Sequence, residues 1–164
     1  MTYAPPRAPA AILLLAAALV MPEPAEASLF GTLFAASPPP TLGAREGRLA
    51  PCPATPNCVT SGAADAGHAI AAFALGGGPA IAMAALADAI RAQPGANIVT
   101  SRADYLHAEF TSAVFGFVDD AEFLLDAKAG VIHVRSAARL GISDLSVNRA
   151  RAEAIRAAYA ARKP

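Results

Sequence analysis

The sequence predicts one α+β domain: an antiparallel β-sheet of four to five strands with two helices, in the order β-α-β-β-β-β-α. The chain has 164 residues, the length of a single ordinary domain. Hydrophobic residues make up 55% of it, enough for a core. Short apolar runs follow one another between residues 97 and 137, and a stretch of helical period lies on either side of them.

The first strand and helix are expected between residues 68 and 93. His68–Leu75 is an apolar run typical of a strand, and three glycines end it. Pro79 suits the first turn of a helix, where a missing N–H costs no hydrogen bond. The helical spacing i, i+3, i+4, i+7 predicts one buried face, formed by Met83, Leu86, Ala87 and Ile90.

Four further strands are expected after Pro94-Gly95 ends this helix, at Asn97–Ser101, Tyr105–Ser112, Phe117–Asp126 and Val131–Ala137. In Tyr105–Ser112 the side chains alternate: Leu106, Ala108 and Phe110 face one way, and His107, Glu109 and Thr111 the other.

The last two strands form a hairpin around the turn 127–130, with Asp126 opposite Val131. This register pairs Phe123 with Val134 on the core side and Glu122 with Arg135 on the opposite side. Opposite charges directly across a ladder stabilise it by a few tenths to about 1 kcal/mol, so one register satisfies both packing and charge.

A last helix is expected at Val147–Ala161, capped by Asn148 or Ser146, with Asp144 and Asn148 organising the turn before it. The antiparallel sheet would carry both helices on one face.

Residues 1–27 resemble a secretory signal peptide. Arg7 is the positive residue, Ala10–Met21 is apolar, and Ala25-Glu26-Ala27 has the cleavage pattern. The protein is therefore expected to be exported, to a periplasmic or extracellular location; the alternative is an uncleaved segment that anchors it to the membrane. Residues 28–48 are expected to form a Pro-rich linker, and residues 49–164 the single domain.

Cys52 and Cys58 are the only cysteines, and in an oxidising compartment they predict a disulfide. Closing so short a loop would contribute roughly 2 kcal/mol. The alternatives are a metal site or a redox dithiol. Two thiols are too few for a structural zinc, and the spacing is not C-x-x-C.

The overall charge argues against nucleic-acid binding, because 13 basic residues balance 13 acidic ones and there is no Trp for base stacking. The charges are segregated, however. Residues 104–126 hold six acidic and no basic residues, while residues 135–163 hold seven basic and two acidic ones.

The acidic residues Asp119, Asp120 and Glu122 permit two interpretations. They could be a metal or acid–base cluster. We favour a salt-bridge network with Arg135, Arg139 and Arg149, since guanidinium groups fork well onto carboxylates. A catalytic triad of Ser136, Asp120 and a histidine is disfavoured, because the chain has no G-x-S-x-G motif.

Three stretches of the sequence resemble a bacterial and plastid family known as domain of unknown function 1499: residues 49–61 (LAPCPATPNCVTS), 116–126 (GFVDDAEFLLD) and 131–156. The family usually has Ser where this chain has Thr60 and Ala138, and Gly where it has Ser146. Any role of the serine replaced by Ala138 is therefore lost here. As the name states, the resemblance implies no established activity.

The sequence thus predicts a non-catalytic periplasmic or membrane-associated module, without a metal or cofactor, whose Arg-rich motif either closes the fold or binds an anionic small molecule or a protein partner. The candidate ligand-binding residues are Arg135, Ser136, Arg139, Arg149, Asn148, Asp119, Asp120 and Glu122. The rival is a hydrolase or metal-dependent enzyme that uses the acidic cluster with His133.

Overall fold

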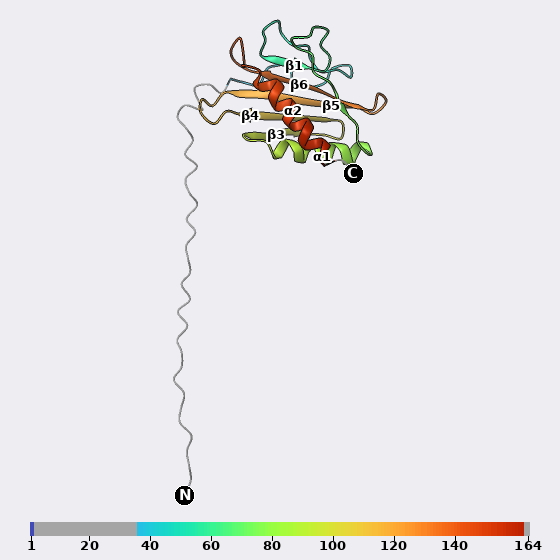
Figure 1. Ribbon diagram of the computed structural model, residues 1–164, viewed down its shortest axis with the longest axis vertical. Coiled ribbons are helices and arrows are strands. Elements are labelled where there is room, and N and C mark those ends of the chain that lie inside the picture. The colour runs from blue at the N-terminus through green and yellow to red at the C-terminus, as the bar shows by residue number, and fades with distance from the viewer. Residues whose placement is uncertain (2–35, 163–164) are drawn as a thin grey trace.

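The computed structural model describes Met1 and residues 36–162. Its centre is an antiparallel sheet in the order β1-β6-β5-β4-β3, with β2 also paired to β6 (Figure 1). The strands are β1 (Cys58–Thr60), β2 (Phe73–Ala74), β3 (Ala96–Ser101), β4 (Tyr105–Thr111), β5 (Val118–Asp126) and β6 (Val131–Ala138). The helices are α1 (Pro79–Arg91) and α2 (Val147–Ala160).

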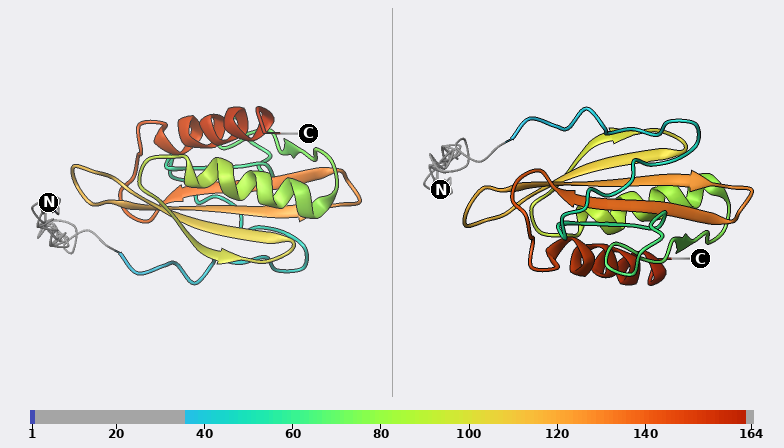
Figure 2. Two further views of the ribbon diagram at one scale, coloured as in Figure 1. Left: turned by 90° about the horizontal axis from the view of Figure 1, so that it is seen from below. Right: turned by 90° about the horizontal axis from the view of Figure 1, so that it is seen from above.

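Both helices cover the same face of the sheet, as the sequence predicts (Figure 2). Their apolar stripes and the inward side chains of β4, β5 and β6 form the core. Phe73 lies at its centre, with its ring 5.7 Å from that of Phe123 and 6.0 Å from that of Tyr159. The predicted α+β class is confirmed.

The register predicted for the β5–β6 hairpin is also confirmed. Asp126 lies opposite Val131, Phe123 opposite Val134, and Glu122 opposite Arg135. Phe123 and Val134 are fully buried against the helices. The hydrophobic pattern and the charge pairing therefore predict the same register, and the structure has it.

The prediction of a strand over His68–Leu75 is wrong for most of its length. Only Phe73–Ala74 pair with β6. Before them, two side chains of α2 take the main-chain acceptors: Arg149 donates to the carbonyl of Ala69, and Arg156 to those of Ala71 and Ala72. These carbonyls are satisfied by guanidinium groups in place of a neighbouring strand.

The sequence did not predict β1. Its three residues pair with the free edge of β6, with Cys58 opposite Ala137 and Thr60 opposite Arg135. The run is too short to show a period, so only the long-range pairing reveals it.

The start of α2 differs from the expectation. Ser146 occupies the N-cap position but has φ 66°, and neither its hydroxyl nor that of another residue caps the helix. Asp144 takes this role, since its carboxylate accepts hydrogen bonds from the main-chain N–H groups of Ser146 and Asn148. The side chain of Asn148 is buried instead of capping the helix.

Residues 36–48, expected as a linker, contact the second face of the sheet, on the side away from the helices (Figure 2). The carbonyl of Ala36 accepts a hydrogen bond from Arg139, and the N–H of Gly43 donates one to Glu122. The predicted signal peptide lies outside the described residues. Within the described part, neither helix has the length and hydrophobicity that a membrane crossing requires.

Candidate functional site

The second face of the sheet carries a buried charge cluster. It consists of His107 and Glu109 on β4, Asp120 and Glu122 on β5, Arg135 on β6, and Arg139 directly after β6. Alternation along the strands sends these side chains away from the helices. Asp120 and Glu122 are only 1% and 0% exposed. Buried charges at this depth require partners.

Arg139 is the centre of the cluster. Its guanidinium donates to both carboxylate oxygens of Asp120, at 2.8 and 2.7 Å, and also to Glu109 and the carbonyl of Ala36. His107 Nε2 lies 2.7 Å from Asp120 Oδ1. Burial acts to raise the pKa of Asp120, but the hydrogen bonds from Arg139 and His107 outweigh it and hold that pKa below its ordinary value. The same hydrogen bonds, which Asp120 accepts, raise the pKa of Arg139.

Glu122 and Arg135 form the second half of the cluster. Glu122 Oε1 accepts hydrogen bonds from the Tyr105 hydroxyl and the Gly43 N–H, both at 2.7 Å, while Oε2 lies 3.4 Å from Arg135 Nη1. Burial, together with the bond to Glu122, raises the pKa of Tyr105. Arg135 Nε is buried without a hydrogen-bond partner in the part of the chain that the structure describes.

A second polar group lies on the helix face of the sheet. Asp119 binds Arg151 of α2 at 2.7 Å, and the hydroxyl of Ser136 donates to Asn148 at 2.5 Å. Arg151 also donates to Asn148, so the three contacts fix the first turns of α2 to β5 and β6.

The structure therefore divides the predicted site residues between two faces. Asp120, Glu122, Arg135 and Arg139 come together as expected; Asp119, Ser136 and Asn148 lie on the opposite face. Arg149 does not join the carboxylates, because its guanidinium binds the carbonyls of Ala69 and Gly67. Sequence reasoning missed Arg151, although the period of two places Asp119 on the side of Phe123 and hence toward the last helix.

These positions bear on the two catalytic alternatives. Asp119 lies across the sheet from Asp120 and Glu122, so the three carboxylates do not converge. Among residues 36–162, no group of three or more His, Cys, Asp or Glu side chains is placed to hold a metal ion. Ser136 and Asp120 are likewise on opposite faces, and a triad that combines them does not form.

A pocket of about 500 Å³ lies beside the cluster, toward the β5–β6 turn. His133 and Ser61 meet in its wall, with Ser61 Oγ 3.2 Å from His133 Nδ1 and also accepting the N–H of Val134. The remaining lining is both polar and apolar: Gly47, Arg48, Leu49, Ala50, Pro51, Thr60, Gly62 and Asp126. No sequence motif indicated this pair, because Ser61 and His133 are 72 residues apart.

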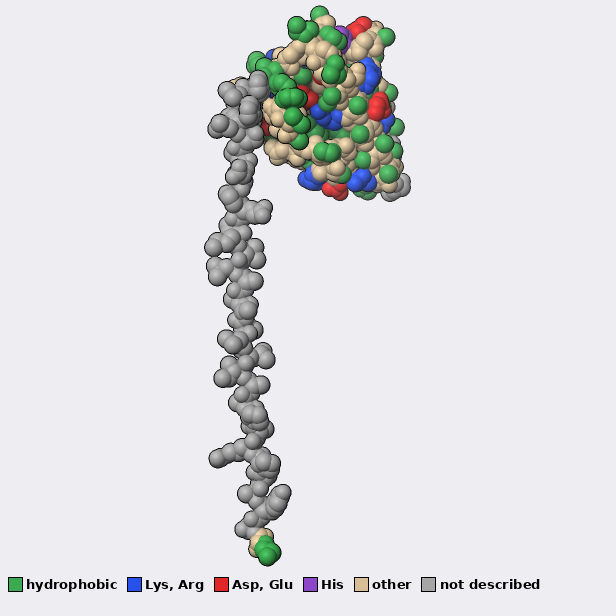
Figure 3. Space-filling model, turned by 60° about the vertical axis from the view of Figure 1, so that its left-hand side comes forward, with side chains coloured by type: hydrophobic (Ala, Val, Ile, Leu, Met, Phe, Trp, Pro, Cys, Tyr) green, Lys and Arg blue, Asp and Glu red, His purple; other side chains and the backbone are tan. Residues whose placement is uncertain are grey.

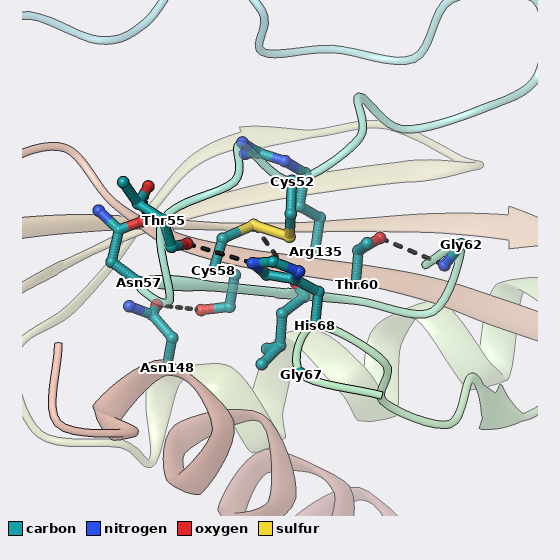
Figure 4. Close-up of a disulfide and its surroundings, with 12 residues drawn as sticks. Cys52, Thr55, Asn57, Cys58, Thr60, Gly62, Gly67, His68, Arg135 and Asn148 are labelled. Atoms are coloured by element: carbon teal, nitrogen blue, oxygen red, sulfur yellow. Dashed lines mark hydrogen bonds between the residues drawn. A yellow bond between two sulfur atoms is a disulfide. The ribbon is translucent and has the colours of Figure 1, made fainter. Parts of the chain in front are cut away.

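The predicted disulfide between Cys52 and Cys58 is confirmed. It closes the loop that leads into β1, with His68 and Arg135 nearby (Figure 4). His68 Nδ1 lies 2.8 Å from Asp65 and Nε2 lies 3.2 Å from the carbonyl of Thr55. Both of these partners are acceptors. The bond to Thr55, followed by that to Asp65, therefore raises the pKa of His68.

The model of a family described as "Protein of unknown function (DUF1499)" matches residues 48–159. This span runs from the disulfide loop to the last turn of α2 and includes both polar groups and most of the pocket wall. No curated protein and no solved structure matches the chain.

Proposed function

Because the chain belongs to the family of unknown function DUF1499, whose name carries no activity, we propose a function from the geometry alone. The protein is a non-catalytic, exported binding module. Its buried charge cluster closes the fold, and a small anionic molecule binds in the pocket beside His133. The observation that carries this proposal is the mutual neutralisation of carboxylates and arginines in the cluster.

The charges of the cluster support a structural role. Three carboxylates, those of Glu109, Asp120 and Glu122, face two guanidinium groups and His107. No positive charge is in excess, so an anion entering there would have to displace a carboxylate already bound. Removing one partner from such a buried pair is costly, which makes the cluster poorly suited to exchange ligands.

The pocket has the opposite character. It is open to solvent, and its polar lining residues are Arg48, His133, Thr60 and Ser61, with Asp126 as the acidic one. The hydroxyl of Ser61 is hydrogen-bonded to Nδ1 of the His133 ring. An arginine and hydroxyl-bearing side chains beside an apolar wall suit a small molecule with a carboxylate or phosphate group.

Export is supported by two features. The disulfide indicates an oxidising compartment, since such bonds are rare in the cytosol. Residues 1–27 have the pattern of a signal peptide, with an uncleaved membrane anchor as the alternative. We place the protein in the periplasm or outside the cell.

The binding proposal can be tested by thermal unfolding with inorganic phosphate and citrate as probes. A ligand that binds only the folded state raises Tm as its concentration rises. At 100 times Kd it adds about 2.7 kcal/mol to the free energy of unfolding. Wild-type protein should show a saturable rise with one of these anions, and Arg48→Ala should abolish it. Arg91→Ala is the matched control, because Arg91 is an exposed arginine on α1, across the sheet from the pocket.

An equal response of wild type, Arg48→Ala and Arg91→Ala would refute binding in the pocket, since it would reflect a general effect of salt. If Arg139→Ala folds normally and alone loses the response, the ligand binds the cluster, and the structural role assigned to the cluster is wrong.

The hydrogen bond between Ser61 and His133 favours a second candidate function, that of a hydrolase. Serine activated by histidine is a common nucleophile, and Asp126 lines the same pocket. Against it, Ser61 Oγ already accepts the Val134 N–H and faces Nδ1 of the ring. Turnover of p-nitrophenyl acetate that disappears in Ser61→Ala would establish the hydrolase; equal background rates would exclude it for this ester.

A further inference from the structure

The end of the sheet farthest from the pocket carries large exposed apolar side chains on two neighbouring loops. Val114 and Phe115 lie between β4 and β5, and Ile142 and Leu145 lie between β6 and α2. They expose 76%, 59%, 75% and 90% of their surface. We define these four residues as the apolar end. The space-filling view shows hydrophobic side chains gathered here (Figure 3).

The two loops are neighbours because β5 begins where β6 ends. Asp119 pairs with Ala138, and the N–H of Arg139 donates to the carbonyl of Val118. The rest of the fold holds the second loop in place, since Asn57 donates a hydrogen bond to the carbonyl of Gly141. The apolar end is therefore a fixed surface of the domain.

Charge is nearly absent from the apolar end. Residues 112–117 contain no charged side chain. The loop between β6 and α2 contains two, Asp144 and Arg139, and the guanidinium of Arg139 is paired with Glu109 and Asp120 in the charge cluster. The carboxylate of Asp144 already accepts hydrogen bonds from Ser146 and from both nitrogens of Asn148. Placing these loops in an apolar medium would thus bury no charged group that lacks hydrogen-bond partners.

The N-terminal part of the chain joins the domain at this same end. The carbonyl of Ala36 accepts a hydrogen bond from Arg139, the first residue of the second loop. The sequence before it includes the apolar run Ala10–Met21 and, nearer the domain, Leu29, Phe30, Leu33 and Phe34. Whether or not residues 1–27 are removed, the sequence just before Ala36 is rich in apolar residues.

We infer that the apolar end docks on a lipid bilayer, with the side chains of both loops inserted at the membrane surface. Protruding loops suit a bilayer better than a second protein, because a stable protein interface needs a complementary surface of about 800 Å² on each partner. Exposed apolar patches commonly mark such contacts. This orientation turns the β5–β6 turn and the pocket beside His133 away from the membrane. The inference does not depend on what the pocket binds.

The absence of tryptophan from the chain allows a direct test with single reporters in the full-length protein. Ile142→Trp and Phe115→Trp each place one fluorophore at the apolar end. Ile81→Trp is the matched control, because Ile81 is also exposed, at 56%, but lies at the start of α1, near the opposite end of the sheet. The probe is phosphatidylcholine vesicles, with and without brominated acyl chains.

Emission from Ile142→Trp and Phe115→Trp should shift to shorter wavelength on adding vesicles and should be quenched by the brominated lipid, while Ile81→Trp changes in neither respect. Sedimentation of the protein with vesicles without any change at residues 115 and 142 would overturn the inference, since the N-terminal segment alone would then bind lipid. A blue shift already present without vesicles would overturn it too: if it depends on protein concentration, a second copy covers the surface, and if it does not, the protein's own N-terminal segment does.

Discussion

His68 connects two turns beside the disulfide, because each ring nitrogen faces an acceptor, Asp65 on one side and the carbonyl of Thr55 on the other. Only the protonated ring donates to both. The contacts raise the pKa of His68, so its contribution to stability is complete below the unfolded value near 6.5 and is lost as pH rises through the folded pKa.

We predict that an NMR titration of the His68 ring gives a pKa above 6.5, and that Asp65→Asn moves this pKa down without abolishing the shift, since Thr55 remains. A His68 that titrates at or below 6.5 in the wild type would contradict the double-donor arrangement.

Ser146 shows a residue-scale strain that its substitution can relieve. It has φ 66°, in the left-handed region, and its hydroxyl does not cap α2. A residue with a Cβ pays roughly 1 kcal/mol there, whereas glycine does not. The family that the sequence resembles usually has glycine at this position, and the backbone angle gives the physical reason.

Ser146→Gly should therefore raise the free energy of unfolding by about 0.5–1 kcal/mol, measured by urea denaturation. Ser143→Gly is the control, because Ser143 is in the same loop but does not have a positive φ. It should not stabilise the protein; an equal gain in both variants would show that the backbone angle of Ser146 is not the cause.

At the scale of elements, Gly95, directly before β3, lies close to Thr111 at the end of β4. Its φ is 70°, and an added Cβ would lie 2.3 Å from the carbonyl oxygen of Thr111, which no shift of a flexible side chain could relieve. Gly130 in the β5–β6 turn has φ 68° but open space around it. Substituting alanine at Gly130 tests the backbone strain alone, whereas alanine at Gly95 adds a steric clash to the same strain.

Gly130→Ala should cost about 1–2 kcal/mol of unfolding free energy, from the left-handed backbone alone. Gly95→Ala adds the clash and should cost about 3 kcal/mol or more, because β3 must move away from β4. Urea denaturation measures both. Equal losses would mean that the approach of Gly95 to Thr111 does not constrain the sheet.

The disulfide fixes the loop that delivers β1 to the edge of β6. Replacing both Cys52 and Cys58 by serine should lower the unfolding free energy by roughly 2 kcal/mol, the loop-closure value for so short a bridge. Reductant should lower the stability of the wild type by a similar amount and leave the double variant unchanged. A wild type that is insensitive to reductant would show that the bridge does not stabilise the fold.

The elements also show what sequence reasoning can reach. The β5–β6 hairpin was predictable to the residue because alternation and the Glu122–Arg135 pair demand the same register. The run 68–75 was mistaken for a strand because its hydrophobicity resembles one, while its carbonyls bind arginines from a helix some 80 residues away. Pairings of this kind, like that of Ser61 with His133, leave no local pattern.

At the scale of the whole molecule, the acidic and basic halves of the sequence meet as predicted, but on two faces of one sheet. Arg139 serves the cluster on the second face, and Arg151 binds Asp119 on the helix face. The segregated charges of the sequence predict that the acidic segment and the basic segment neutralise each other. Which arginine reaches which carboxylate depends on the path of α2, which local patterns do not specify.

The two proposals assign different ends of the molecule to different tasks. The pocket beside His133 lies toward the β5–β6 turn, and the apolar end lies at the opposite ends of the same strands. Between them, the buried charge cluster joins the sheet to residues 36–43. The cluster is therefore the part of the molecule on which both surfaces depend for their positions.

The most direct test of this account is the free energy of unfolding of Arg139→Ala, with Arg91→Ala as the control. Removing Arg139 leaves Asp120 buried and without its bidentate partner, so we predict a loss of about 3–5 kcal/mol. Arg91→Ala breaks an exposed pair and should change stability by about 0.5 kcal/mol at most. If Arg139→Ala is as stable as the wild type but no longer binds an anion that the wild type binds, the cluster is a recognition site and its structural role is refuted.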